Sequence, residues 1–428
     1  MKPIRDFLRR ARMDAARLDL DAFCRAYLQE MVRGLEGRPS SLPMIPTFIE
    51  TSREVPRGER VIALDAGGTN LRVASVSFDA SGAPVIEGLT RHRMPGVEAA
   101  VSKEEFFRTL AEAVRPHLRG ADRIGFCFSY PAEITPQRDG RLVQFTKEIK
   151  AEGVEGELVG AGLARALAAD RTVPIVVLND TVATLLAGRN AVPGRRFDDF
   201  IGLVCGTGLN AAYVERTALI RKLGGGDDGS MVVNTESGSF ARGARGAVDD
   251  AFDATMANPG RYRHEKAISG AYLGALCRFA AQAAARAGFL SGEASRRLEG
   301  VASLSTRELN DFLLYPDRAD HPLGAAVAGL ADDARALYVL CDAIVERAAA
   351  MVAVNLAGIV RKTGRGRDPR YPVCITVDGT TFWQLRTFRV RVESWMRRLL
   401  SGDHGRAWEI ASVDDAPLLG AAIAALTN

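Results

Sequence analysis

Hydrophobic and polar positions alternate along the chain with two periods, one typical of helices and one typical of strands. Apolar residues recur at three- and four-residue spacing in long segments, and shorter apolar runs bounded by Gly, Pro or Asn lie between them. Strands are predicted near 61–64, 71–78, 123–131 and 173–179, on both sides of Thr207, from 371 and from 408. Helices are predicted at 20–35, 103–118, 156–168, 271–290, 326–358 and 383–400, from 181 and after the last strand. This alternation predicts an α/β fold.

Two Gly-Thr turns join pairs of predicted strands. The first lies in LDAGGTNLRV, around Thr69, and the second lies in GLVCGTGLN, around Thr207, about one domain length further along the chain. In both, the element after the glycines alternates like a strand, whereas a Walker loop or a dinucleotide fingerprint needs its glycines to open a helix. The repeat predicts two related α/β halves facing one cleft. A plain hairpin turn is the alternative for either turn alone.

The first turn has the residues that a phosphate-binding turn needs. Glycine has no Cβ, so Gly67 and Gly68 would let backbone N–H groups approach phosphate oxygens, and Thr69 and Asn70 would add side-chain donors. Asp65, at the end of the preceding strand, could hold hydrated Mg²⁺.

A third turn of the same kind follows an apolar strand in VDGTTFW, residues 377–383. Its alternative interpretation is an Asp or Thr that caps the helix behind it. Three Gly-Thr turns together favour phosphate binding, and Arg72, close behind the first turn, would add positive charge.

Asn179 and Asp180 stand between two apolar runs in PIVVLNDTVATLLAG, where an ordinary core segment would carry neither. One interpretation is that Asp180 caps a helix beginning at Thr181. The other is chemical, because a carboxylate at the carboxyl end of a strand, where two α/β halves meet, lies where such sheets bind ligands. It can accept a proton from a hydroxyl nucleophile. Together with phosphate-binding turns, such a base predicts phosphoryl transfer.

Composition and charge narrow the class of partner. The 56 basic and 52 acidic side chains are spread without long blocks, which argues against nucleic acid and favours a small partner. The six cysteines lie far apart among apolar neighbours, so we expect buried thiols in a reducing compartment. The sequence has no apolar run of about 20 residues, and we expect no leader peptide and a cytoplasmic monomer or homodimer without a membrane partner. The five histidines are expected on the surface.

Eight motifs occur in the order in which hexokinases have them, and the chain from about residue 20 onward resembles that family. They are LDAGGTNLRV, FCFSYP, QFTKEIK, LNDTVATLL, GLVCGTGLNAAYVE, VNTESGSF, HEKAISGAYLG and VDGTTFW, with MIPTFI before them. The resemblance implies the actin-like ATPase (ribonuclease H-like) fold, with two domains around a central cleft. It also implies ATP-dependent phosphorylation of a hexose at its 6-hydroxyl, with glucose favoured.

The resemblance further implies roles for single residues. Asp180 would be the base, with Lys147 and Arg72 as further catalytic groups. The residues that would hold the sugar are Ser129, Thr146, Lys147, Asn179, Asp180, Asn210, Glu236 and Glu265. The residues that would surround ATP are Asp65, Gly67, Gly68, Thr69, Asn70, Thr207, Gly208, Gly379 and Thr380, with Asp65 directing Mg²⁺ through water.

A domain division follows from the same resemblance. Residues 1–56 would form an N-terminal segment packing on the large domain, residues 57–180 with 412–428 the small domain, and residues 181–411 the large domain. Because the sugar-binding residues come from both halves, sugar binding should draw the halves together and expel water.

Several departures from the family pattern bear on substrate choice. Glu148 stands where Gly usually follows the Thr-Lys pair, and Ser237 stands where Trp usually follows the motif glutamate, so we expect a reshaped sugar pocket. The glycine-rich loop on the adenine side appears as SVDDAPLLGAA, and the residues after Thr380 lack the usual Lys and His-Pro. Another hexose, another phosphoryl donor, or a sugar-sensing protein without turnover are therefore kept as alternatives.

Overall fold

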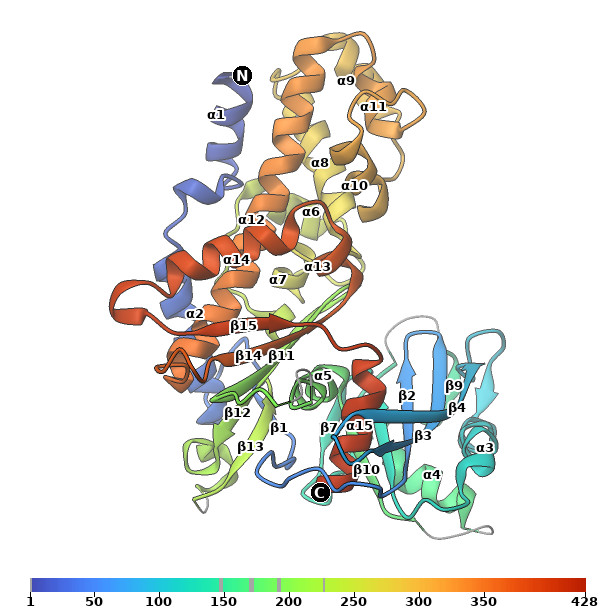
Figure 1. The fold of residues 1–428 in the computed structure, drawn as a ribbon. Helices are drawn as coiled ribbons and strands as arrows, with labels where there is room; N and C mark the ends of the chain where they lie inside the picture. Colours follow the sequence, from blue (N-terminus) through green and yellow to red (C-terminus); the bar gives the residue numbers. More distant parts are fainter. Residues whose placement is uncertain (1, 146–148, 169–172, 191–193, 226–227) are drawn as a thin grey trace.

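The computed structural model describes residues 2–145, 149–168, 173–190, 194–225 and 228–428, and it confirms the α/β fold. Two β-sheets divide the molecule into a smaller and a larger lobe (Figure 1). Two helices, α5 (Asp180–Gly188) and α15 (Ala416–Thr427), lie where the lobes meet. Both predicted strand–turn–strand hairpins are present, one in each sheet.

The sheet of the smaller lobe carries the first hairpin. In its order β10-β6-β2-β3-β4, β6 and β10 are parallel to β2, while β3 and β4 run antiparallel to their neighbours. The strands are β2 Val61–Gly67, β3 Asn70–Phe78, β4 Pro84–Arg93, β6 Ile124–Phe128 and β10 Ile175–Leu178. Helices α3 (Lys103–Val114) and α4 (Val159–Leu167) form a core with one face of the sheet. Two ribbons pair β5 (Val101–Ser102) with β9 (Ala151–Glu152) and β7 (Ala132–Ile134) with β8 (Gly140–Leu142).

The sheet of the larger lobe carries the second hairpin. In its order β1-β13-β12-β11-β14-β15, β14 and β15 are parallel to β11 and the other pairs are antiparallel. The strands are β1 Ile45–Pro46, β11 Asp199–Cys205, β12 Leu209–Arg216, β13 Ser230–Asn234, β14 Val373–Asp378 and β15 Trp408–Ala411. The exact division of the chain into two domains stays a prediction.

Helices make up most of the rest of the larger lobe. They are α1 Lys2–Arg10, α2 Leu20–Leu35, α6 Ala247–Ala254, α7 Arg263–Lys266, α8 Leu273–Arg286, α9 Gly292–Glu299, α10 Thr306–Leu314, α11 Pro322–Val327, α12 Ala331–Thr363, α13 Thr380–Gln384 and α14 Phe388–Leu399. Figure 1 shows α12 running through this lobe, and α1, α2, α8 and α14 all pack against it.

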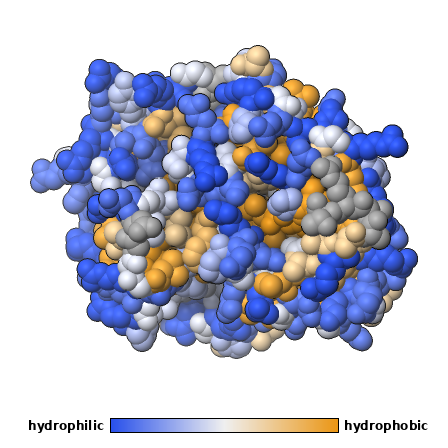
Figure 2. Space-filling view, turned by 90° about the horizontal axis from the view of Figure 1, so that it is seen from below, coloured by the Kyte–Doolittle hydropathy of each residue, from blue (hydrophilic) through white to orange (hydrophobic). Residues whose placement is uncertain are grey.

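The 33-residue helix α12 is a core element. By length and composition it is apolar enough to cross a membrane, a property that was not expected from the sequence, but 89% of its most apolar window is buried inside the fold. The face of the molecule in Figure 2 is largely hydrophilic, with hydrophobic residues in separate areas.

Helix α12 begins at Ala331 rather than near 326, because α11 ends at Val327 and Gly329 takes a φ of 77° that no continuous helix permits.

The helix predicted at 383–400 is two helices. Helix α13 ends at Gln384, Leu385 is extended, and Thr387 takes a left-handed φ of 58° before α14 begins at Phe388. The apolar positions of both helices keep nearly the same spacing, and for that reason the hydrophobic pattern did not reveal the break.

The prediction that all five histidines lie on the surface is wrong for three of them. His117, His264 and His321 are buried, while all six cysteines are buried as expected. His117 is hydrogen-bonded to Ser75 and His264 to Asn355, partners that are remote in sequence. Such partners are what allow a polar ring to be buried, and local sequence does not reveal them.

Helix α5 is held between helix α15 and the larger sheet by very close contacts. A Cβ on Gly420 of α15 would lie 1.9 Å from the carbonyl oxygen of Ala183 in α5. A Cβ on Gly188, at the end of α5, would lie 1.9 Å from the side-chain oxygen of Thr376 in β14. Only glycine permits these approaches, so α5 is fixed against both the C-terminal helix and the larger sheet.

We expect Gly420→Ala to lower the free energy of unfolding by about 3 kcal/mol, because the new methyl group would force α5 and α15 apart. The measurement is the apparent unfolding temperature at one fixed heating rate. Gly292→Ala is the matched control, since Gly292 lies in a helix and a Cβ there would meet no atom within 4 Å, and its unfolding temperature should stay the same or rise slightly. Equal behaviour of the two variants would contradict the close contact.

Candidate active site

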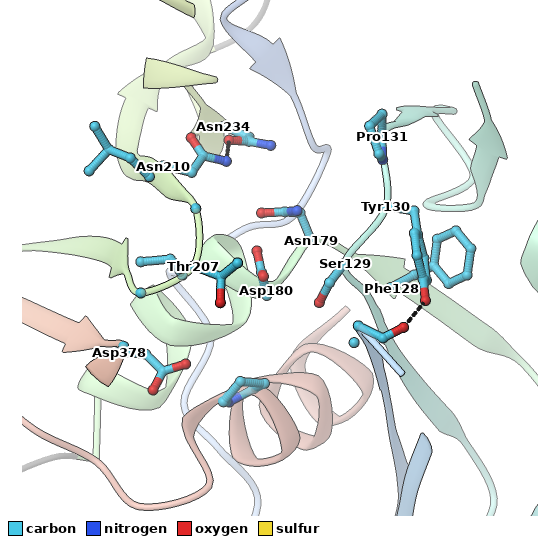
Figure 3. A pocket seen from close by; sticks show the side chains of 18 of the residues that line it. Phe128, Ser129, Tyr130, Pro131, Asn179, Asp180, Thr207, Asn210, Asn234 and Asp378 are labelled. Atoms are coloured by element: carbon cyan, nitrogen blue, oxygen red, sulfur yellow. Dashed lines mark hydrogen bonds between the residues drawn. The ribbon is translucent and has the colours of Figure 1, made fainter. Parts of the chain in front are cut away.

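A cleft of about 1030 Å³ opens between the lobes, and residues from both sheets line it (Figure 3). Most of them stand at strand ends or in the turns that follow. The predicted site residues found in its wall are Asp65, Gly67, Gly68, Arg72, Ser129, Asn179, Asp180, Thr207, Gly208, Asn210, Glu236, Glu265, Gly379 and Thr380. The motifs read from the sequence therefore identified groups that lie far apart along the chain and meet in one cleft.

Four predicted site residues are not found among the residues that line the cleft. Thr69, in the turn between β2 and β3, and Asn70, the first residue of β3, are not part of the cleft wall, and the Asn70 side chain is exposed. Thr146 and Lys147, with the departure at Glu148, lie outside the described residues. Their roles stay predictions.

Asp180 is the first residue of α5, and Figure 3 shows its carboxylate in the cleft. The interpretation that Asp180 caps a helix beginning at Thr181 is wrong. Asn179 is the cap, because its side-chain oxygen accepts a hydrogen bond from the Thr181 N–H at 2.9 Å. Asn179 thus satisfies the helix end, and the neighbouring carboxylate stays available to the cleft.

The environment of Asp180 makes it a stronger base than an ordinary aspartate. Burial and the negative charge of nearby Asp65 raise the pKa of Asp180, while hydrogen bonds from Thr181 and Ser129 partly offset the rise. The Thr181 hydroxyl donates to the carboxylate at 3.3 Å. A carboxylate with a raised pKa accepts a proton more readily, which suits a general base.

Asn210, Asn234 and Glu236 form a hydrogen-bonded cluster in the cleft wall of the larger lobe. The Asn210 amide donates to Asn234 at 2.8 Å and to Glu236 at 3.1 Å, and the Asn234 amide donates to Glu236 at 2.8 Å. Burial raises the pKa of Glu236, and the charge of Asp180 adds to the rise. Asn234 was not predicted, although it ends β13 much as Asn179 follows β10, and this repeated strand-end amide could have revealed it.

Glu265 is held against the second Gly-Thr turn. Its carboxylate accepts a hydrogen bond from the Leu209 N–H at 2.9 Å. A Cβ on Gly208 would lie 3.0 Å from the same carboxylate oxygen, and a Cβ on Gly238 would lie 3.1 Å from the Glu265 Cβ. Small residues on both sides therefore allow an acidic side chain to lie close to the turn.

Arg72 bridges two aspartates from distant parts of the chain. Its guanidinium donates to Asp65 at 2.9 and 2.7 Å and to Asp415 at 2.6 Å. Asp415 precedes α15 and takes a left-handed φ of 53°. In the sequence the loop around Asp415 stood out only as a departure from the family pattern, and this ion pair was missed. Arg72 therefore fixes the Asp65 carboxylate as well as adding positive charge.

The second and third Gly-Thr turns are in direct contact. Gly379 takes a φ of 122°, and a Cβ there would lie 2.4 Å from the backbone of Cys205. The Thr381 hydroxyl donates to the Gly206 carbonyl at 2.9 Å and ties the two turns together. Gly379 is the residue before α13 and no side chain caps that helix, so the alternative of an Asp or Thr cap is wrong.

Asp65 and Asp378 fit a magnesium ion held partly through water. Both carboxylates line the cleft, and burial together with the charge of Asp65 raises the pKa of Asp378. The described residues contain no group of three His, Cys, Asp or Glu side chains that could hold a metal alone. Mg²⁺ does not need one, because it keeps several waters and takes phosphate oxygens beside one or two carboxylates.

The departure at Ser237 does not reshape the cleft wall directly. Ser237 is fully buried and is not among the lining residues, although its neighbour Glu236 is. Ser237 reaches the sugar pocket through its neighbour Glu236, which takes a left-handed φ of 55°, and through Asn210, whose side-chain oxygen accepts a hydrogen bond from the Ser237 N–H at 3.3 Å.

Two family models that both describe hexokinase match residues 3–190 and 200–427. The chain is 32% identical to Hexokinase-1 of Oryza sativa subsp. japonica, over 97% of this chain and 88% of that protein. It is 31% identical to a hexokinase of Schistosoma mansoni, over 86% of this chain and 85% of that protein. It is also 30% identical to Hexokinase-3 of Mus musculus, where the match covers 87% of this chain but 42% of the mouse protein.

Solved structures agree with these matches. The hexokinase from Schistosoma mansoni complexed with glucose has a TM-score of 0.78 at 27% identity, over 99% of this chain and 98% of that one. A ROK hexokinase from Thermus thermophilus shares the fold, with a TM-score of 0.52 at 19% identity over 86% of this chain and 97% of that one. The expected actin-like ATPase fold is confirmed, and the chain belongs to the hexokinase family of sugar phosphotransferases.

Proposed function

We propose that the protein transfers the γ-phosphoryl group of ATP to the 6-hydroxyl of a hexose, with glucose as the favoured acceptor. The observation that carries the proposal is the position of Asp180 in a cleft with hydrogen-bonding side chains in one part of its wall and glycine turns in another. The similar hexokinase from Schistosoma mansoni is complexed with glucose, which supports the choice of acceptor.

The polar cluster suits a sugar. A hexose is a ring of hydroxyl groups, each of which donates and accepts hydrogen bonds. Asn179, Asn210 and Asn234 offer amide groups, and Glu236 and Glu265 offer acceptors. A site that pairs every hydroxyl discriminates against analogues lacking one, because its own buried groups are then left unpaired. Thr146 and Lys147 are proposed to complete this set.

Asp180 acts as the base in the proposed reaction. As the 6-hydroxyl oxygen attacks the γ-phosphorus, its proton passes to the Asp180 carboxylate. The bond between that oxygen and phosphorus forms, the bond from phosphorus to the bridging oxygen breaks, and ADP carries away the electron pair. The hydrogen bond from the Thr181 hydroxyl orients the carboxylate during this step.

The three Gly-Thr turns are proposed to hold the phosphates. Gly67, Gly68, Gly208 and Gly379 leave room for phosphate oxygens to approach backbone N–H groups. When bound with the nucleotide, Mg²⁺ would neutralise part of the phosphate charge. Asp65, oriented by Arg72, would hold that ion through water.

Location, assembly and domain movement are part of the same proposal. The protein is expected to be cytoplasmic and to act as a monomer or homodimer, and residues 57–180 with 412–428 are expected to move as one domain against residues 181–411. Phosphorylation of another hexose, use of another donor, and sugar sensing without turnover are the competing functions. The presence of a base beside phosphate-type turns argues against the silent sensor.

We expect Asp180→Asn to lower kcat by about 10²–10⁴-fold, because the amide keeps the shape but cannot accept the proton. The Kd for glucose should stay within about tenfold. The measurements are a coupled assay with Mg-ATP and sugar binding by calorimetry. Asp403→Asn, an exposed residue outside the cleft, is the control and should leave both unchanged. A fast Asp180→Asn enzyme would show that another group takes the proton.

The same variant should be more stable than the native protein without ligands. The folded-state pKa of Asp180 is raised above the ordinary value of 3.8. The protonated side chain therefore contributes its full stability to the folded state only below pH 3.8, and this contribution is lost as pH rises through the folded-state pKa. At pH 7 Asp180→Asn should therefore raise the unfolding temperature by roughly 1–3 °C. The difference should shrink towards pH 4. A difference that grows on acidification would contradict the burial and charge argument.

A substrate panel separates the competing functions. The coupled assay is run with glucose, fructose, mannose and N-acetylglucosamine as acceptors, and with ATP, ADP, GTP and polyphosphate as donors. We expect the highest kcat/KM with glucose and ATP. Glucose binding without turnover for any donor would favour the sugar sensor and contradict the proposal of a kinase. Preference for another hexose or donor would correct only that part.

Sugar binding should also close the cleft, since the groups proposed to bind it lie on both lobes. We expect the radius of gyration from solution scattering to decrease at saturating glucose. Glu236→Ala at the same glucose concentration serves as the control and should keep the open value. An unchanged radius with glucose demonstrably bound would rule out closure by the sugar alone.

A further inference from the structure

Trp383 forms part of the cleft wall at a place where the mechanism uses no residue. It lies in α13, three residues after Thr380 and thus about one helical turn beyond the third Gly-Thr turn. Its neighbour Gln384 lines the cleft as well. A large aromatic side chain therefore stands on the cleft wall next to the turn that is proposed to hold phosphate.

The Trp383 ring is held in one orientation before any ligand binds. Its indole N–H donates to the Val377 carbonyl at 3.1 Å, so the one polar group of the ring is satisfied. The Phe382 ring packs edge-on at 5.1 Å between centroids, and the Arg389 guanidinium lies 5.0 Å from the indole centroid. Little side-chain freedom is left to lose on binding, which favours stacking of a planar ligand.

We propose that Trp383 is the stacking platform for the base of a nucleoside triphosphate donor. Trp383 lines the cleft, and base–aromatic stacking is a strong contact in nucleotide-binding sites. The Arg389 cation near the same ring is paired with Glu393, and Arg386, which follows α13, is paired with Asp342, so the aromatic ring rather than charge carries the proposed recognition of the base. This inference rests on the proposed phosphoryl transfer and names how its donor is recognised.

Stacking has a consequence for donor choice. Every nucleobase has an aromatic face, so a platform of this kind separates nucleotides from bare polyphosphates more strongly than it separates one base from another. ATP and GTP should therefore depend on Trp383 to a similar extent, and a donor without a base should not depend on it.

The first test compares variants by steady-state kinetics with glucose as acceptor. We expect Trp383→Ala to lower kcat/KM for ATP and for GTP by about 5- to 100-fold, mostly through KM, while the inhibition constant of tripolyphosphate against ATP stays unchanged. Trp383→Phe should keep most of the native value because it keeps an aromatic face. Trp395→Phe is the matched control, since Trp395 bonds to Glu346 outside the cleft, and it should behave like the native protein.

The second test reads binding without turnover. The chain has three tryptophans, so Trp395→Phe combined with Trp408→Phe leaves Trp383 as the only indole. We expect its fluorescence to be quenched saturably by ATP and not by tripolyphosphate. This test does not depend on catalysis, and it separates a failure of this inference from a failure of the proposed function.

Two results would overturn the inference. One is an unchanged kcat/KM for ATP in Trp383→Ala, with no ATP-dependent quenching of Trp383. The other is an equal loss of ATP and tripolyphosphate binding in Trp383→Ala, which would mean that the ring only supports the phosphate turn through Val377. If the native protein does not phosphorylate glucose with ATP but Trp383 is quenched by ATP, the platform stands and the proposed reaction falls.

Discussion

The site depends on the position of one helix, α5, because Asp180 is its first residue and Asn179 is its cap. That helix lies between helix α15 and the larger sheet at distances that only glycine allows, with Gly420 against Ala183 on one side and Gly188 against Thr376 on the other. The base is therefore placed by backbone contacts rather than by a flexible loop. The turns and the polar cluster are arranged around a carboxylate whose position is set by packing.

Charge is the second constraint on the cleft. The charge of Asp65 acts on both Asp180 and Asp378, and among the described residues Arg72 bonds to Asp65 and is shared with Asp415. Repulsion between carboxylates raises the pKa of Asp180 and of Asp378 beyond the effect of burial. This arrangement costs stability when the cleft is empty, and it is typical of sites in which a ligand supplies the missing positive charge or hydrogen bonds.

Local sequence patterns predicted the fold class and most of the site residues, but they missed residues whose role depends on contacts between distant segments. Both hairpins follow from alternation and glycine placement, and the polar pair in PIVVLNDTVATLLAG indicated the base. Asn234, Asp378 and Trp383 were missed as single site residues because their importance depends on which strand ends meet. The pairing of Arg72 with Asp415 spans 343 residues, and two of the three buried histidines, His117 and His264, are hydrogen-bonded to partners that are also remote in sequence. Contacts of this kind are set by tertiary packing, which periodicity does not encode.

The long helix α12 carries a consequence for handling the protein. Its apolar side chains are hidden only while α2, α8 and α14 remain docked on it. Once heat unfolds the larger lobe, the apolar side chains of this 33-residue helix are exposed to other protein chains, and aggregation competes with refolding. The storage lifetime of the protein would then depend on the unfolding rate of that lobe, and not on the equilibrium between native and denatured protein.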